Sequence, residues 1–148
     1  MKKFFAVFGV ALLLTLLSGC GSAKPGLLGL KAELLTIELN GQGGAVASWQ
    51  LANPNVVSYI VSESRHKIYI GGRYIGTAIT KKATGVPSRA NIPQAEPIAL
   101  EKDAAGFLAT AGGTASYRVD SDLTIQLYGE IFEHHHSTAA GTVQIVRK

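Results

Sequence analysis

From residue 30 onward, apolar positions recur at every second residue, which is the period of a half-buried β-strand. Two such runs flank the glycine-rich turn at 40–44 and therefore predict an antiparallel hairpin. The positions predicted to face inward are Leu35, Ile37, Leu39, Ala45, Ala47, Trp49 and Leu51.

The clearest hairpin is expected around Gly71 and Gly72, which separate the β-rich runs 67–70 and 73–79. Two consecutive glycines suit a type I′ turn, in which both central residues have positive φ. A longer alternation over 117–127 places apolar residues at odd positions and polar residues at even ones. It predicts a long antiparallel strand with one face in water.

Proline interrupts the strand pattern in two places. At Asn53-Pro54-Asn55 it removes a backbone donor, and the two asparagine side chains can bond neighbouring backbone groups instead. An apolar strand is expected to resume over 56–61. The segment 80–97 contains three prolines, which favour loops and an edge strand over a central strand.

One short helix is expected near 101–111, where apolar residues recur at helical spacing and Asp103 falls in the first turn. Gly112 can end it. A connection is predicted at 133–140, followed by a last strand that holds Val143 and Ile145. The sum is a mainly β chain of six to eight antiparallel strands and one helix, which has the size of a β-sandwich.

The N-terminus has the pattern of a secretory signal rather than of a folded element. Lys2 and Lys3 precede an apolar run over 4–17 that ends in small residues. The run is shorter than the roughly 20 residues that a spanning helix needs. We therefore expect residues 1–19 to be a cleaved signal peptide, and residues 30–148 to form a single domain.

The only cysteine of the chain follows Leu17, Ser18 and Gly19 directly. This arrangement resembles the lipobox of bacterial lipoproteins, in which the cysteine becomes residue one and carries a diacylglyceryl thioether. Cys20 is then the membrane anchor, and residues 20–29 form a flexible spacer. An ordinary signal peptide with an incidental cysteine is the alternative. If Cys20 carries lipid, no disulfide can form.

Composition excludes two broad classes of protein. Without Lys2 and Lys3, 12 basic and 10 acidic residues remain, and the basic residues are scattered rather than clustered. This pattern does not favour a nucleic-acid partner. Hydrophobic residues make up 47% of the chain and charged residues 16%, which is not the composition of a disordered protein.

In order along the chain, these motifs resemble the water stress and hypersensitive response domain, the second subgroup of late embryogenesis abundant proteins. The likeness spans about residues 30 to 147. The residues that carry it are Asn53, Pro54, Asn55, Gly71, Gly72 and Gly76. The resemblance implies a fibronectin type III-like β-sandwich that is linked to desiccation and other stress. It implies protection of membranes or client proteins, without catalytic residues or a cofactor.

Several residues could carry chemistry, but a structural explanation is better for each. The run from His134 to His136, with His66, could supply metal ligands; its polar surroundings favour a solvated turn, and no metal is predicted. The carboxylates of Asp120 and Asp122 share the polar face of the long strand. Exposed strand faces commonly carry such residues, so no catalytic role is needed to explain them.

Glycines at 41, 43 and 44 lack the third glycine of a dinucleotide loop and the helix that should follow. Trp49 and Tyr59 are expected in the core, whereas Tyr69 and Tyr74 flank the glycine turn and suit a contact surface.

The sequence therefore predicts a lipid-anchored, non-enzymatic protein that protects its neighbours during water stress. Gly21 after Cys20 is not the aspartate that retains many lipoproteins at an inner membrane. In a bacterium with two membranes, the expected location is the periplasmic face of the outer membrane. A carrier of lipid or another apolar ligand, and an envelope module that binds a protein partner, are the alternatives.

Overall fold

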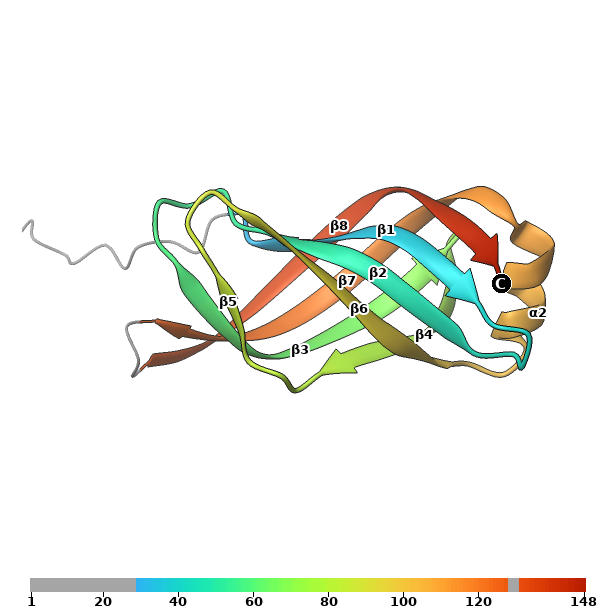
Figure 1. Cartoon of the computed structure of the whole chain (residues 1–148), viewed down its shortest axis with the longest axis horizontal. Helices are drawn as coiled ribbons and strands as arrows, with labels where there is room; N and C mark the ends of the chain where they lie inside the picture. Colours follow the sequence, from blue (N-terminus) through green and yellow to red (C-terminus); the bar gives the residue numbers. More distant parts are fainter. Residues whose placement is uncertain (1–28, 128–130) are drawn as a thin grey trace, which may run out of the picture.

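The computed structural model describes residues 29–127 and 131–148, which form eight strands and one short helix (Figure 1). The elements are β1 (Lys31–Leu39), β2 (Ala45–Ala52), β3 (Tyr59–Ile70), β4 (Arg73–Thr80), β5 (Thr84–Val86), β6 (Asn91–Leu100), α2 (Ala104–Ala111), β7 (Gly113–Leu127) and β8 (Ile131–Arg147). In this part of the chain, no helix combines the length and apolarity needed to span a bilayer.

The chain is mainly β, as predicted, but the strands close into a barrel rather than a sandwich. Around the barrel the order is β4, β6, β2, β1, β8, β7 and β3, and β3 pairs back with β4. The short β5 pairs with β3 beyond the end of β4. The predicted fibronectin-like sandwich is therefore wrong. Inward and outward residues alternate identically in both architectures, so alternation alone cannot distinguish them.

The backbone ladders that close the barrel are short. β1 pairs with β8 through only 36–39 and 144–147, in parallel, although purely antiparallel pairing was predicted. β4 pairs with β6 through only 76–78 and 98–100. Both ladders lie toward the end of the barrel where α2 packs (Figure 1). The α2 end is therefore closed by backbone hydrogen bonds.

Side chains bridge the two halves of the barrel at the opposite end. His135 Nε2 donates to the carbonyl oxygen of Leu30 at 3.1 Å, which joins β8 to the start of β1. Gln94 Nε2 donates to Thr84 Oγ1 at 2.8 Å, which joins β6 to β5. No backbone ladder pairs the strands at these positions.

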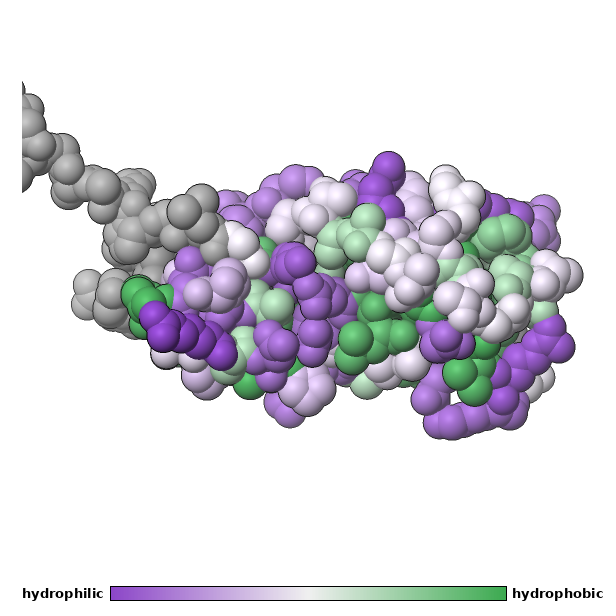
Figure 2. Space-filling view, turned by 90° about the horizontal axis from the view of Figure 1, so that it is seen from above, coloured by the Kyte–Doolittle hydropathy of each residue, from purple (hydrophilic) through white to green (hydrophobic). Residues whose placement is uncertain are grey.

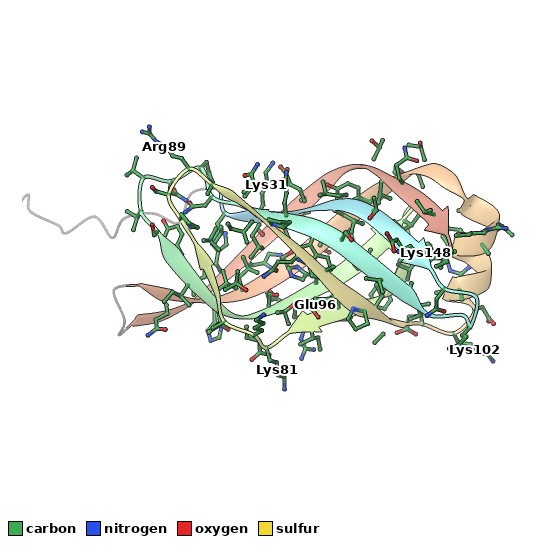
Figure 3. All side chains as sticks on the ribbon, viewed as in Figure 1. Lys31, Lys81, Arg89, Glu96, Lys102 and Lys148 are labelled. Atoms are coloured by element: carbon green, nitrogen blue, oxygen red, sulfur yellow. The ribbon has the colours of Figure 1, made fainter. Side chains whose placement is uncertain are left out.

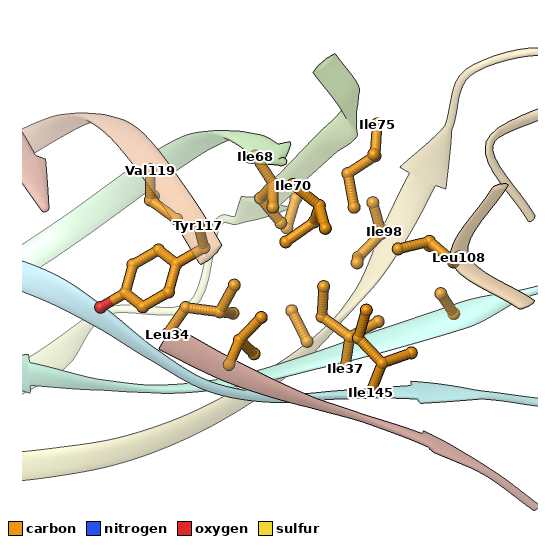
Figure 4. Close-up of a cluster of buried hydrophobic side chains, with 14 of the residues drawn as sticks. Leu34, Ile37, Ile68, Ile70, Ile75, Ile98, Leu108, Tyr117, Val119 and Ile145 are labelled. Carbon is orange, nitrogen blue, oxygen red and sulfur yellow. The ribbon is translucent and has the colours of Figure 1, made fainter. Parts of the chain in front are cut away.

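Two apolar clusters fill the barrel, one at each end. The larger, at the α2 end, is drawn in Figure 4. Its large members include Leu34, Ile37, Trp49, Ile68, Ile70, Ile75, Ile98, Leu108, Tyr117, Val119 and Ile145. The smaller cluster comprises Leu30, Ala32, Leu51, Tyr59, Val61, Val86, Leu123 and Ile125. The helix, predicted near 101–111, buries Ala104 and Leu108 against the first cluster, and Asp103 precedes its first turn.

Three expectations about the strands need correction. Leu35 was expected inside but is 45% exposed, because a β-bulge at 34–36 shifts the alternation of β1. The looser segment expected at 80–97 contains a full strand, β6, with Pro93 and Pro97 in it. The connection expected at 133–140 is instead part of β8, which pairs with β7 through residues 131–145.

The two prolines fit in β6 because they need no ladder donor. β6 pairs with β2 through residues 91–98 and with β4 only through residues 98–100. A proline in such a strand lies where its missing N–H would point away from the partner, here away from β2. The backbone nitrogens of Pro93 and Pro97 therefore face the gap between β6 and the strands β4 and β5.

The hairpin between β3 and β4 has the glycine geometry that the sequence predicts. Gly71 and Gly72 have φ of 56° and 82°, which L side chains rarely adopt. Gly76 has φ of 151° and opposes Ile68 at a bulge in the β3–β4 pairing. A Cβ at Gly76 would collide with the carbonyl oxygen of Ala99 on β6. Glycine at 76 thus permits the close approach of β4 and β6 that closes the barrel.

We predict that Gly76→Ala will lower the free energy of unfolding by about 2–4 kcal/mol, through positive φ and the collision with β6. Gly85→Ala is the matched control, because a Cβ there meets nothing within 4 Å and the backbone is unstrained. The control should stay within about 0.5 kcal/mol of wild type. Urea unfolding followed by tryptophan fluorescence measures both. Equal stabilities for the two variants would contradict this role of Gly76.

Candidate functional site

Asn53 is buried and joins several segments at the end of the barrel away from α2. Its side-chain Nδ2 donates to the carbonyl oxygens of Val57 at 2.9 Å, Pro87 at 2.9 Å and Val86 at 3.3 Å. Its Oδ1 accepts from both the backbone and the side-chain nitrogen of Asn55, each at 3.0 Å. The asparagine thereby ties the end of β2 to the segment before β3 and to the end of β5.

Backbone hydrogen bonds of residues 53–55 connect to the segment after β5 as well. The Asn53 N–H donates to the Ala90 carbonyl at 2.9 Å, and the Arg89 N–H donates to the Asn55 carbonyl at 3.0 Å. Pro54 packs against Gly29, where the described chain begins. Asn53 and Asn55 thus bond within the fold, and their geometry is that of a structural junction rather than of an open binding site.

Aromatic and arginine side chains surround the β3–β4 turn, at the α2 end of the barrel. The Tyr69 and Tyr74 rings lie 5.4 Å apart, and the Arg118 guanidinium stacks over Tyr69 at 4.0 Å. On the turn itself, Arg73 lies over the Phe107 ring of α2 at 4.9 Å. We call these five residues the hairpin surface. Aromatic and arginine side chains are common anchors in protein interfaces.

The histidine run lies in β8 and not in the solvated turn that was predicted. His134 and His136 are exposed on the outer face of the barrel, and His136 Nδ1 lies 2.8 Å from Asp122 Oδ1. His135 is half-buried and bonds Leu30, as described above. His66 is fully buried in the barrel interior. The outer histidines and His66 therefore face opposite sides of the sheet.

No three histidine, cysteine or acidic residues are grouped to hold a metal ion anywhere in residues 29–127 and 131–148. Asp120 and Asp122 lie on the outer face, as the alternation of β7 predicts. Asp120 accepts from Thr138 Oγ1 at 3.0 Å and pairs with Arg118 at 3.3 Å. Both carboxylates therefore have a cross-strand partner on β8, which is Thr138 for Asp120 and His136 for Asp122.

A buried polar layer separates the two apolar clusters, and sequence reasoning did not find it. His66 is at its centre: Nδ1 lies 2.8 Å from Ser121 Oγ, and Nε2 lies 3.0 Å from Ser64 Oγ. The imidazole also packs on Trp49, with ring centroids 4.5 Å apart. Thr80 and Ser137 contribute buried hydroxyl oxygens that have no hydrogen-bond partner among the described residues.

The electrostatics of the layer keep His66 neutral. Burial lowers the pKa of His66 to about 4, and the nearby Asp122 carboxylate opposes this shift with a smaller effect. A neutral imidazole has one donor nitrogen and one acceptor nitrogen, which the two serine hydroxyls can satisfy together. The only signal in the sequence was the run of small polar residues at alternate positions of β3, which also suits a strand facing water.

The position of the sequence motif at Leu17, Ser18, Gly19 and Cys20 lies outside the described residues. Hydrophobic side chains on the visible face form small, separate patches among polar ones (Figure 2). Across the described part of the chain, the large hydrophobic side chains that are exposed are Leu35, Val56, Ile60, Ile79 and Val146.

No family model matches the chain, and no curated protein matches it. Solved structures do. The solution structure of a protein from Arabidopsis thaliana has a TM-score of 0.53 at 14% sequence identity, with 80% of this chain and 83% of that chain covered. A candidate late embryogenesis abundant protein of Arabidopsis has a TM-score of 0.41 at 13% identity, over 96% and 86%. A protein of Archaeoglobus fulgidus has a TM-score of 0.40 at 16% sequence identity, with 67% of this chain and 82% of that chain covered.

The structural neighbours thus include a candidate late embryogenesis abundant protein, and the protein with a TM-score of 0.53 shares the fold of this chain. At these identities, the likeness concerns the fold alone. None of the three neighbours is described as an enzyme.

We predict that Asn53→Ala will lower the free energy of unfolding by about 2–4 kcal/mol. The change removes a buried amide and leaves the carbonyl oxygens of Val57 and Pro87 short of a donor. Asn55→Ala is the control, since Asn55 loses one side-chain bond to Asn53 and should cost about 1 kcal/mol. Chemical denaturation of both variants tests the ranking, and the reverse order would refute it.

We also predict that His66 makes the fold weaker in acid. The pKa is about 4 in the folded chain and 6.5 unfolded, so the unfolded chain binds more protons between these values. Stability therefore falls as the pH drops from about 6.5 to 4, by about 3 kcal/mol from this group, and this contribution changes no further below pH 4. In His66→Gln, the slope of unfolding free energy against pH should flatten across that window. An unchanged slope would show that other groups cause it.

Proposed function

We propose that this protein is a lipid-anchored, non-catalytic module of the bacterial cell envelope that protects neighbouring proteins during drying or osmotic stress. Three features support the proposal. They are the lipobox-like sequence ending at Cys20, the resemblance of the Asn53 and Gly71–Gly72 motifs to the water stress domain, and the fold that the chain shares with its structural neighbours.

The interior of the barrel favours a protective function over lipid transport. An acyl chain needs a continuous apolar path, and the described interior is filled by two clusters separated at His66 by a polar layer. Insertion of lipid would bring hydrocarbon against buried hydroxyls that need hydrogen-bond partners. This interruption favours a protein that acts through its outer surface over a carrier of lipid or another apolar ligand.

The position of the hairpin surface favours proteins over the anchoring bilayer as its target. The described chain begins at Gly29, at the end of the barrel opposite α2, whereas Tyr69 and Tyr74 lie at the α2 end (Figure 1). At about 3.3 Å per residue, the 12-residue strand β3 spans roughly 40 Å. An anchor on Cys20 would leave this surface pointing away from the membrane, toward soluble or periplasmic clients.

The mechanism would be weak contact at high local concentration. A module bound to the membrane by lipid stays near every protein in the same thin layer, so that weak contacts can occur often. Stacked tyrosine and arginine side chains bind apolar and acidic groups alike, which suits clients that expose both on unfolding. No step in this mechanism requires a reaction centre.

Binding of a dedicated envelope partner by an added strand is less well supported. The exposed flank of β6 is the place for such a strand, yet Pro93 and Pro97 remove two of its backbone donors. An added strand depends on an unbroken row of such groups.

We predict that deleting the gene will lower survival after drying and after osmotic shock, and that the wild-type chain will restore it. Cys20→Ala should give a folded protein that leaves the membrane fraction and restores survival poorly, because its local concentration falls. A substitution in the hairpin surface, Tyr69→Ser, should keep the protein on the membrane and also restore survival poorly. Counting colonies after controlled drying, with fractionation of the cells, measures these effects. Normal survival of the deletion strain would argue against the proposal.

A further inference from the structure

The barrel wall is open between β6 on one side and β4 and β5 on the other. β6 leaves β4 after the short ladder at 98–100, and its remaining length pairs only with β2. The opening is a groove of about 440 Å³, within the range of small-molecule sites. Its lining residues are Thr80, Lys82, Ala83, Thr84, Gly85, Pro93, Gln94, Ala95 and Glu96.

Two polar groups in the groove have no partner in the described chain. Thr80 is only 5% exposed, and its hydroxyl oxygen makes no hydrogen bond. A buried hydroxyl in this state is unfavourable unless something else binds it. Glu96 is half-buried at an inward position of β6 and forms no ion pair with the described residues (Figure 3).

The other polar groups of the groove are already arranged in a fixed chain. The Trp49 indole N–H donates to Gln94 Oε1 at 3.1 Å, and Gln94 Nε2 donates to Thr84 Oγ1 at 2.8 Å. The Thr84 hydroxyl in turn donates to the carbonyl oxygen of Lys82 at 3.3 Å, so Thr84 Oγ1 keeps one lone pair that can accept a further hydrogen bond. Thr80, Thr84 and Glu96 therefore present donors and acceptors around one opening.

We propose that this groove binds a neutral polyhydroxylated solute, that is, a small sugar or sugar alcohol. Adjacent hydroxyls of such a molecule can donate to the Glu96 carboxylate and to Thr84 Oγ1, while another accepts from the Thr80 hydroxyl. The lining carries one cationic side chain, Lys82, and one anionic side chain, Glu96. Because these charges balance, the groove suits an uncharged ligand. This site is separate from the hairpin surface and does not depend on the proposed function.

The lining disfavours the other classes of small ligand. A quaternary ammonium compound needs aromatic faces, and the groove lining contains no aromatic residue. An anion would meet the Glu96 carboxylate. An extended peptide needs alternating backbone donors and acceptors, whereas Pro93 lacks a donor on this side of β6. Sugar hydroxyls, by contrast, can donate to the carbonyl oxygens of β6 and need no backbone donor from that strand.

The chain carries its own reporter for this site. Trp49 is the only tryptophan, and its indole N–H is bonded to the amide of Gln94, which lines the groove. A solute that engages Glu96 and Thr80 beside Gln94 should change the hydrogen bond of the indole and hence its emission. Binding can thus be followed without a label.

The test is a titration of the full-length chain in a detergent without sugar headgroups, using glucose, trehalose and sorbitol separately. At least one should give a saturable change in tryptophan emission and a calorimetric isotherm with one site per chain. Thr80→Val and Glu96→Gln should each raise the half-saturating concentration at least about tenfold. Both changes nearly preserve side-chain volume, and circular dichroism will show that the variants fold.

Thr138→Val is the matched control, because it makes the same chemical change on the outer face, where Thr138 bonds Asp120. It should bind like wild type, and glycine betaine should not saturate with any chain. Excluded solutes stabilise proteins without saturating a site. A linear response to all three sugars would therefore overturn the proposal. Saturation that is equal in wild type, Thr80→Val and Glu96→Gln would overturn it as well.

Discussion

The architecture depends on how its two halves are joined. Near α2, short backbone ladders close the barrel, and Gly76 permits this by leaving room for the Ala99 carbonyl. At the other end the strands diverge, and side chains make the connection instead: His135 to Leu30, and Gln94 to Thr84. This unequal closure is what leaves one apolar cluster sealed, opens the groove beside β6, and gives Asn53 three segments to tie together.

Alternation in the sequence predicted the inward faces of β2 and β7, the glycine hairpin and the helix, because each depends on neighbours close in the chain. It could not predict barrel closure, which is decided by short contacts between distant strands. Leu35 was misplaced because a bulge shifts the phase of β1. The inward position of His66 was hidden in the same way: a second bulge, between Val61 and Glu63, moves the buried positions of β3 from odd to even numbers.

The polar layer favours the observed pairing of the strands. A slip of one residue in β3 would turn His66 toward water and carry charged neighbours such as Arg65 and Lys67 inside. Ser64 lies on the same strand as His66, whereas Ser121 of β7 is opposite the imidazole only in the observed register. Such a layer costs apolar burial and in return penalises alternative pairings. The candidate site thus depends on contacts that no local pattern encodes.

The prolines of β6 have a consequence for a protein confined to a surface. If the chain is held in a bilayer by lipid, its copies share two dimensions and meet far more often than in bulk solution. An uncovered strand flank then risks joining the same flank of a neighbour, the first step toward a fibre. With Pro93 and Pro97 along that flank, two of the donors needed for such zippering are missing. Dense packing on a drying membrane would then stay reversible.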